Sequence, residues 1–331
     1  MTNKERYEKF CESTYVPIYS KSWWMDAVCG PDNWDVWLYE SGGEILAAMP
    51  YYMERRGKYK YITKAPLTQN NGIIFKYDPR AKLSAELRFE EKVINSACVY
   101  IAGLGVDVYE QQYQYSFQNW LPFFWNYYTQ ITRYTYVVED TSDLDAIWNN
   151  IEKSRRNRIK KGQQNTTLHE GMSPEEFYRW NETVYTKQGL ITPFSYDLWE
   201  RLYKACVTHN SGKILYRTDS EGNVACISFI VWDDQFVYKL IGGAIPDRSF
   251  LEAHSAMTWN QIEFAHKHGL KFDFEGSVIK RISKSFREYG GIPKAYFRIR
   301  KVFNEEILRK EAEEQIARIR NEKMAVTTAK G

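Results

Sequence analysis

The chain has 331 residues, of which 44% are hydrophobic and 26% are charged, and this composition is typical of a folded globular protein. It excludes a disordered or collagen-like chain. With 45 basic and 42 acidic residues the formal charge is +3, which is too balanced for a protein that binds nucleic acid through its overall charge.

Cysteine usage and hydropathy indicate the compartment. The five cysteines are scattered and odd in number, as expected for reduced thiols. The polar residues 1–10 contain no apolar segment typical of a signal peptide. No run reaches the roughly 18 apolar residues that span a bilayer. We therefore expect a cytoplasmic protein whose contact with a membrane, if any, is peripheral.

In the first half, hydrophobic alternation predicts strands, and a run of helix formers predicts one helix. Ser41-Gly42-Gly43-Glu44 is typical of a hairpin turn between two of the strands. The aromatic residues 109–128 are predicted to be irregular. The predicted strands cover residues 34–40, 45–53, 72–75, 99–104 and 131–138, and the predicted helix covers residues 80–97.

The second half contains clearer helix signals. Ser173-Pro174-Glu175-Glu176 is a capping box with proline in the first turn, and Ser195 is typical of a second helix start. The predicted helices cover residues 143–161, 174–187, 195–207, 255–268 and 281–289, and the predicted strands cover residues 213–218, 224–232, 235–241, 270–274 and 295–302.

The order of elements in the second half is repeated weakly in the first half. We interpret this order as a duplicated α/β topology without a visible sequence repeat. The predicted organisation is an amino-terminal subdomain (residues 1–139), a carboxy-terminal subdomain with the site (140–303) and a charged helical tail (304–331).

Two acids are the main catalytic candidates. Asp273 and Glu275 are two residues apart at the end of the predicted strand 270–274, so both should point to one face. Ligands often bind at the carboxyl ends of strands, and two close carboxylates raise one pKa, which favours a general base. The alternative is that both acids only form structural ion pairs with the nearby cations.

Histidine and serine residues give weaker signals. His254 lies at the junction of a predicted loop and helix, where it would deprotonate an amine or simply begin the helix. Ser277 would cap the helix that follows it. His266 and His268 diverge on a helix, so we predict no metal site.

Basic residues are concentrated in two segments. Lys280, Lys284 and Arg287 share a predicted helix and suit a pyrophosphate or nucleotide diphosphate, although a solvated face is the alternative. The other segment suits RNA phosphates, an anionic membrane surface or, again, solvent. Its six cations are Lys153, Arg155, Arg156, Arg158, Lys160 and Lys161.

Motifs in both halves share the pattern of one enzyme superfamily. The sharpest are Phe272-Asp273-Phe274-Glu275-Gly276-Ser277 and Ser285-Phe286-Arg287-Glu288-Tyr289-Gly290-Gly291. Three further segments match the superfamily pattern more loosely. They are Lys239-Leu240-Ile241-Gly242-Gly243, residues 154–162 and Pro66-Leu67-Thr68-Gln69. With the order of elements, these motifs resemble the FemAB-like branch of the GNAT acyltransferases, which includes the peptidoglycan interpeptide-bridge aminoacyltransferases.

This resemblance implies two tandem GNAT-like subdomains and a transferase that moves an acyl or aminoacyl group to an amine. The implied acceptor is a cell-wall precursor, an amino sugar or a peptide amine. The acyl group would lie between strands 235–241 and 270–274, where a backbone amide of residues 240–242 would hold the oxyanion. The implied donor contacts are Leu240, Ile241, Gly242, Gly243, Ser255, Ser277, Lys284 and Arg287.

The sequence leaves the donor open between acetyl-coenzyme A and aminoacyl-tRNA. An aminoacyl-tRNA-dependent, bridge-forming transferase is therefore the first alternative, and it would use the cations of residues 153–161. A different class of protein, a non-catalytic module that binds a nucleotide sugar or a lipid head group, is the second alternative.

Overall fold

One mixed sheet runs through both halves of the chain. The computed structural model describes residues 1–187, 189–246 and 251–328. Within these residues twelve strands form a sheet in the order β1-β2-β3-β5-β12-β6-β11-β10-β9-β8-β7, and β4 pairs with β2.

The first half contains six strands and four α-helices within the described residues. A short 3₁₀ helix, Ile18–Ser20, precedes α2. The strands are β1 (Trp34–Ser41), β2 (Glu44–Arg56), β3 (Tyr59–Thr63), β4 (Ile74–Phe75), β5 (Val108–Gln112) and β6 (Thr129–Val138), and the helices are α1 (Asn3–Ser13), α2 (Ser22–Cys29), α3 (Leu83–Gly103) and α4 (Leu121–Trp125).

The second half begins with two helices, and its three consecutive strands β8, β9 and β10 follow a second helix pair. Its strands are β7 (Thr167–Glu170), β8 (Gly212–Thr218), β9 (Val224–Trp232), β10 (Phe236–Ala244), β11 (Lys271–Asp273) and β12 (Ile292–Val302). Its helices are α5 (Leu144–Asn150), α6 (Lys153–Asn165), α7 (Pro174–Thr186), α8 (Tyr196–Thr208), α9 (Leu251–His268), α10 (Lys280–Glu288) and α11 (Glu305–Thr328).

The predicted strand over residues 99–104 is wrong. These residues belong to the last turns of α3, whose buried side chains recur at helical spacing from Val93 to Ile101 while Val99 is exposed. A short apolar run fits either a strand or a buried helical turn, because periodicity alone does not separate them. The strand that the fold uses instead is β5, inside the aromatic stretch predicted to be irregular.

The predicted helix over residues 143–161 is two helices. The backbone is extended rather than helical at Ile151 and Glu152, which separate α5 from α6. The guanidinium of Arg156 donates to the carbonyl oxygens of Trp148, Asn149 and Ile151, so it satisfies the otherwise unpaired end of α5. The break is therefore stabilised by a side chain from the helix that follows it.

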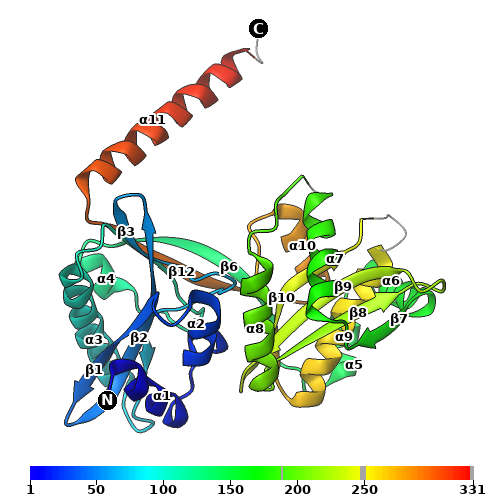
Figure 1. Cartoon of the computed structure of the whole chain (residues 1–331), viewed down its shortest axis with the longest axis horizontal. Helices are drawn as coiled ribbons and strands as arrows, with labels where there is room; N and C mark the ends of the chain where they lie inside the picture. The colour runs from blue at the N-terminus through cyan, green and yellow to red at the C-terminus, as the bar shows by residue number, and fades with distance from the viewer. Residues whose placement is uncertain (188, 247–250, 329–331) are drawn as a thin grey trace.

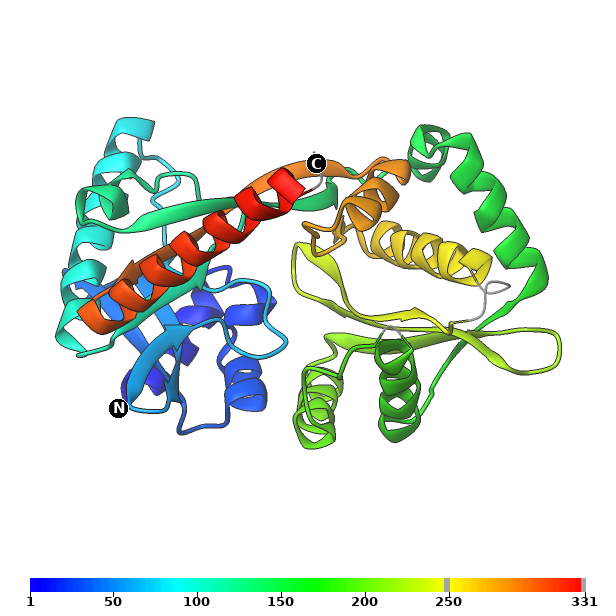
Figure 2. The same ribbon diagram turned by 90° about the horizontal axis from the view of Figure 1, so that it is seen from above.

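Helices cover both faces of the sheet in the second half. Buried side chains of α7 and α8, such as Phe177 and Trp199, pack on one face with Phe229 of β9. Buried side chains of α6 and α9, such as Ile159 and Met257, pack on the other face. Figure 2 shows the two layers, with α9 and α6 on one side of the strands and α7 and α8 on the other.

Two long strands connect the halves. β12 pairs with β6 from Ile292 to Arg300 and with β5 from Arg298 to Val302. Strand β6 in turn pairs with β11 through Val137 and Val138. Figures 1 and 2 show β6 and β12 running between the two lobes. The last strand of the chain is thus an inner strand of the first half's sheet.

Candidate functional site

Strands β10 and β11 separate soon after they meet. They pair in parallel for three residues, from Phe236 opposite Lys271 to Tyr238 opposite Asp273, and β11 ends there while β10 continues to Ala244. On the other edge of β10 the register with β9 shifts between Lys239 and Ile241. Leu240 is therefore the extra residue of a β-bulge, placed where the two parallel strands diverge.

Asp273 lies inside the protein at this divergence. Its Oδ1 accepts hydrogen bonds from the Thr135 hydroxyl and, at 2.7 Å, from the Glu275 backbone amide. Burial raises its pKa to about 6, although both hydrogen bonds favour the charged form. Asp273 is thus a buried, hydrogen-bonded carboxyl. Its hydrogen bond to the Glu275 amide orients this next acid in the chain.

Glu275 is placed by a left-handed backbone turn rather than by a strand. Its φ is 64°, which an L-residue rarely adopts, so the prediction that both acids project from one strand face is wrong. Its Oε1 is shielded from solvent and has no hydrogen-bond partner among the described residues. Burial, not a neighbouring carboxylate as predicted, raises the pKa of Glu275 well above its usual range.

Glu275 lies where two cavities meet. A cavity of about 530 Å³ extends from it over the first half, and one of about 430 Å³ extends toward Leu240. Lys64 and Gln69 line both cavities with it. The Gln69 side chain donates to the Glu275 carbonyl oxygen at 2.5 Å, which ties the Pro-Leu-Thr-Gln segment of the first half to the acid.

The two strands that connect the halves contribute cations that the sequence analysis missed. Arg133 of β6 and Arg298 of β12 line the 530 Å³ cavity, and the Nε of each is buried without a partner among the described residues. Arg298 also donates to Glu110 at 2.6 Å. These arginines stand on strands with no shared motif, so no signal in the sequence joins them to Glu275.

A family comparison decides the identity of this arrangement. Residues 135–278 match the family described as acetyltransferase (GNAT) domain, and this range includes the bulge, the divergence and both acids. The chain carries a GNAT acyltransferase domain. It is accordingly an acyltransferase, as the resemblance in the sequence implied. No curated protein matches the chain in sequence.

Solved structures share the fold of this chain across nearly its whole length. FemX superposes with a TM-score of 0.68 at 12% identity and covers 93% of this chain and 98% of its own. L-PGS from Bacillus licheniformis gives 0.51 at 9%, with 91% and 92% covered. A tandem GNAT protein from the clavulanic acid biosynthesis pathway gives 0.50 at 8%, with 90% and 94% covered. The predicted α/β fold of two tandem GNAT-like subdomains is confirmed.

His254 lies outside the two cavities of this GNAT domain. It is in α9, with its Nε2 3.2 Å from the ammonium of Lys239, which also donates to Thr258 at 2.9 Å. The Lys239 charge and burial together hold the pKa of His254 well below its usual range. Burial lowers the pKa of Lys239 to about 8. The structure therefore does not bring His254 together with the two acids.

The implied donor contacts fall into three groups. Leu240 and Ser277 line the cavities around Glu275, and Ser277 accepts from the Ile279 amide instead of capping α10. Lys284 and Arg287 are exposed on α10. Of the remaining four, Ile241 is buried and Ser255 is buried with its hydroxyl bonded to Arg155. Gly242 is exposed and Gly243 is half-buried, and a side chain on either would meet Ile227 or Val184.

Arg155 does not belong to the predicted RNA-binding face. Its guanidinium is buried, donates to Glu288, Ser255 and Ser285, and lies 4.9 Å from the centre of the Tyr289 ring. Arg155 therefore joins α6, α9 and α10 and is not available to a partner. Lys153, Arg158, Lys160 and Lys161 stay exposed on the same helix.

Two further observations bear on the predicted chemistry. Within the described residues no group of three or more His, Cys, Asp or Glu side chains is arranged to hold a metal ion. Among the described helices, none has the length and apolar content needed to cross a membrane.

Proposed function

We propose that this GNAT protein transfers an acyl or aminoacyl group to the amine of an acceptor bound at Glu275. The observation that supports this proposal is that the Glu275 carboxyl lines the cavity that reaches the β10 bulge and has a shielded Oε1 without a partner among the described residues. A general base needs a raised pKa and access to the attacking amine, and Glu275 combines both.

The proposed reaction divides the work between backbone and side chains. The acceptor amine attacks the carbonyl carbon of the thioester or ester, and the negative charge forms on the carbonyl oxygen. The Leu240 amide, which the bulge removes from regular pairing with β9, would stabilise that charge. Glu275 takes the proton from the amine and passes it to the leaving thiolate or alkoxide as the C–S or C–O bond breaks. The Asp273 carboxylate orients Glu275 by accepting a hydrogen bond from the Glu275 backbone amide.

The cations of the cleft support an anionic acceptor. Arg133 and Arg298 present guanidinium groups in the cavity that contains Glu275, and Lys64 is exposed at its edge. Guanidinium groups bind phosphates and carboxylates through paired hydrogen bonds. A phosphorylated cell-wall precursor offers such groups, whereas a free amino sugar offers only its ammonium. We therefore favour the cell-wall precursor as the acceptor class.

The donor remains one of two classes, acetyl-coenzyme A or aminoacyl-tRNA. The test is a thermal-shift panel with each donor, since a ligand that binds the native state raises the melting temperature. Aminoacyl-tRNA binding should also weaken steeply with salt and depend on Lys160 and Lys161. A panel in which neither donor raises the melting temperature would count against the proposal.

Glu275→Gln tests the base with the donor that binds. The variant keeps the shape of the side chain but cannot accept the proton, so kcat should fall by about 10²–10⁴. Glu170→Gln is the matched control, because Glu170 is an exposed residue of β7 paired with Lys213. A Glu275→Gln enzyme with unchanged kcat would exclude Glu275 as the base.

Arg133→Gln tests the acceptor site. Removal of this cation should raise KM for an anionic acceptor by about ten-fold or more while kcat changes little, because the lost contact is the same in ground and transition states. An acceptor without phosphate or carboxylate groups should show no such change. Equal effects on both acceptors would argue that Arg133 only supports the fold.

A further inference from the structure

The loop that carries Glu275 also presents apolar side chains to solvent. Val278 is 76% exposed and Ile279 is 50% exposed. Tyr134 of β6, also 50% exposed, lines the 530 Å³ cavity with them. Single exposed apolar residues are common on protein surfaces. Here three of them gather at the opening of the cleft, which is the arrangement seen at interaction sites.

The backbone fixes which side of this loop faces outward. Glu275 and Gly276 both have φ of 64°. A Cβ on Gly276 would lie 2.3 Å from the carbonyl oxygen of Tyr134, so the loop is pressed against β6 with no room for a side chain. The Ser277 hydroxyl then accepts from the Ile279 amide. The same turn therefore directs Glu275 into the cleft and leaves Val278 and Ile279 in solvent.

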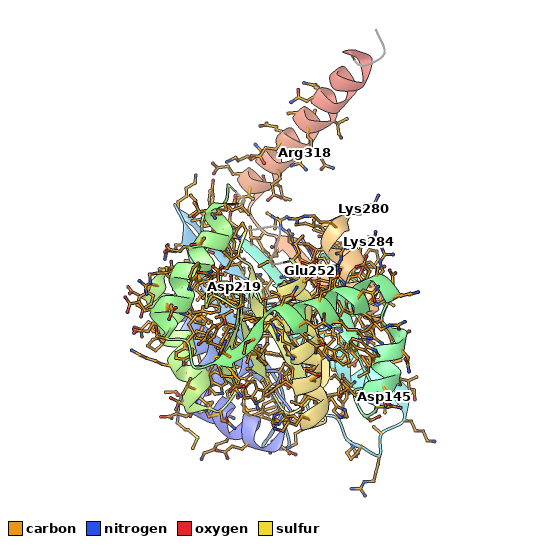
Figure 3. The ribbon with its side chains drawn as sticks, turned by 90° about the vertical axis from the view of Figure 1, so that its right-hand side faces the viewer. Asp145, Asp219, Glu252, Lys280, Lys284 and Arg318 are labelled. Atoms are coloured by element: carbon orange, nitrogen blue, oxygen red, sulfur yellow. The ribbon has the colours of Figure 1, made fainter. Side chains whose placement is uncertain are left out.

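Helix α10 adds a positive field beside these apolar side chains. It begins directly after Ile279, and Lys280, Arg281, Lys284 and Arg287 are all exposed. Its single acid, Glu288, is occupied by the buried Arg155. Figure 3 shows Lys280 and Lys284 with their side chains on the outside of the molecule. The surface at the cleft opening is thus apolar at the loop and cationic along the helix.

We propose that this surface, formed by Tyr134, Val278, Ile279 and the first turns of α10, docks on an anionic phospholipid bilayer. The aliphatic side chains enter the interfacial region, and the lysines and arginines contact the lipid headgroups. An RNA backbone would pair with the cations but would leave Val278 and Ile279 without a partner. The apolar pair therefore favours a bilayer over a nucleic acid.

Docking places the opening of the cleft against the membrane. An acceptor that is amphipathic or attached to lipid would then reach Glu275 from the bilayer surface without leaving it. This consequence rests on the proposed function, whereas the docking itself does not need catalysis.

Vesicle co-sedimentation tests the docking with no donor or acceptor present. The full chain should bind vesicles of phosphatidylcholine with phosphatidylglycerol and should not bind vesicles of phosphatidylcholine alone. Val278→Ser with Ile279→Ser should reduce the partition at least ten-fold. Lys280→Glu with Arg281→Glu should reduce it by about five-fold for each cation removed. Circular dichroism and thermal unfolding check that each variant is folded.

Lys160→Glu with Lys161→Glu is the matched control, because it makes the same charge change on another exposed helix, α6. It should keep most of the vesicle binding. Equal loss in this control, or no binding of the wild-type chain to anionic vesicles, would overturn the proposal. Loss of RNA binding in the α10 variant with no effect of the apolar variant on vesicles would show that the surface serves a nucleic acid instead.

The two proposals fail separately. If Glu275→Gln retains vesicle binding but also retains full transfer, the base assignment is wrong and the docking stands. If the α10 and loop variants lose no vesicle binding while Glu275→Gln loses transfer, the docking is wrong and the transferase site stands.

Discussion

At the scale of single residues, the two acids differ in what the structure lets each one do. The Oδ1 of Asp273 accepts from the Thr135 hydroxyl and a backbone amide, whereas Glu275 keeps a shielded oxygen without a partner among the described residues. A buried carboxyl without hydrogen bonds is costly in its charged form, so it holds its proton more tightly. The pair thus consists of a positioning residue and a base candidate.

Asp273 gives a prediction about stability and pH. Its folded pKa of about 6 lies above the ordinary 3.8, so the folded state binds the proton more tightly than the unfolded chain. The wild type should therefore lose stability as pH rises from about 4 to above about 6, and the loss from this group should be about 3 kcal/mol. Below pH 4 both states carry the proton and no loss remains.

The measurement is the unfolding free energy of the wild type minus that of Asp273→Asn, by urea titration across this pH range. The subtraction removes the titration of groups that both proteins share. A difference that stays flat from pH 4 to pH 7 would contradict a raised pKa for Asp273.

Arg155 gives a second prediction at the residue scale. Arg155→Ala removes the buried cation that neutralises Glu288, whose side chain is only 14% exposed, and leaves this carboxylate only the exposed Lys284, 3.8 Å away. The expected loss of unfolding free energy is about 3–5 kcal/mol. Arg158→Ala, an exposed change on the same helix, should stay within about 0.5 kcal/mol. Chemical denaturation of both variants checks this, and equal losses would contradict the structural role of Arg155.

At the scale of elements, the contact between α6 and α9 depends on one glycine. A Cβ on Gly162 would lie 2.1 Å from the carbonyl oxygen of Glu252, so the helices approach at a point where only glycine fits. Arg155 of α6 bonds to Ser255 of α9 close to this crossing. The first turn of α9 is therefore held against α6.

Gly162→Ala should destabilise the protein by about 1–3 kcal/mol, because the methyl group forces the two helices apart. Gly103→Ala is the matched control in α3, where a Cβ meets nothing within 4 Å. The control should be neutral or stabilising by up to about 1 kcal/mol, since alanine favours helix more than glycine does. Thermal unfolding distinguishes them, and a neutral Gly162→Ala would contradict the close approach.

Elements also show where sequence patterns fail. The caps at Ser173 and Ser195 are present, with each hydroxyl accepting from the amide three residues on, because a cap depends only on near neighbours in the chain. Strand β5 was missed because its partner β12 lies almost 200 residues away and no local alternation marks it. Pairing with distant strands makes this segment a strand, although its local sequence pattern is irregular.

At the scale of the whole molecule, β6 and β12 make the two halves one sheet. Ile299 of β12 is fully buried in the core of the first half, between β5 and β6. The cleft cations Arg133 and Arg298 stand on these same two strands. The connection between the halves and one wall of the candidate site are therefore the same structure.

This arrangement predicts that residues 1–139 do not fold alone. Without β12, β5 and β6 lose their shared neighbour, and the core loses Ile299. The isolated fragment should show no cooperative thermal transition, whereas residues 1–139 joined by a flexible linker to residues 290–304 should regain one. Cooperative unfolding of the bare fragment would show that β12 is dispensable to the first half.

The sequence by itself determined the α/β class, most helix starts and the segment from Phe272 to Gly291 that contains both acids, because these features depend on residues close together in the chain. Only the tertiary structure decided that the Oε1 of Glu275 is shielded without a described partner, that Arg155 is buried and that Arg133 and Arg298 line a cavity with the acid. Burial and pairing depend on residues far apart, as with Arg155 and Glu288, which are 133 positions apart. A local sequence pattern cannot predict a contact between residues so far apart in the chain. The charge of a side chain also does not determine whether the folded protein leaves that side chain exposed to solvent.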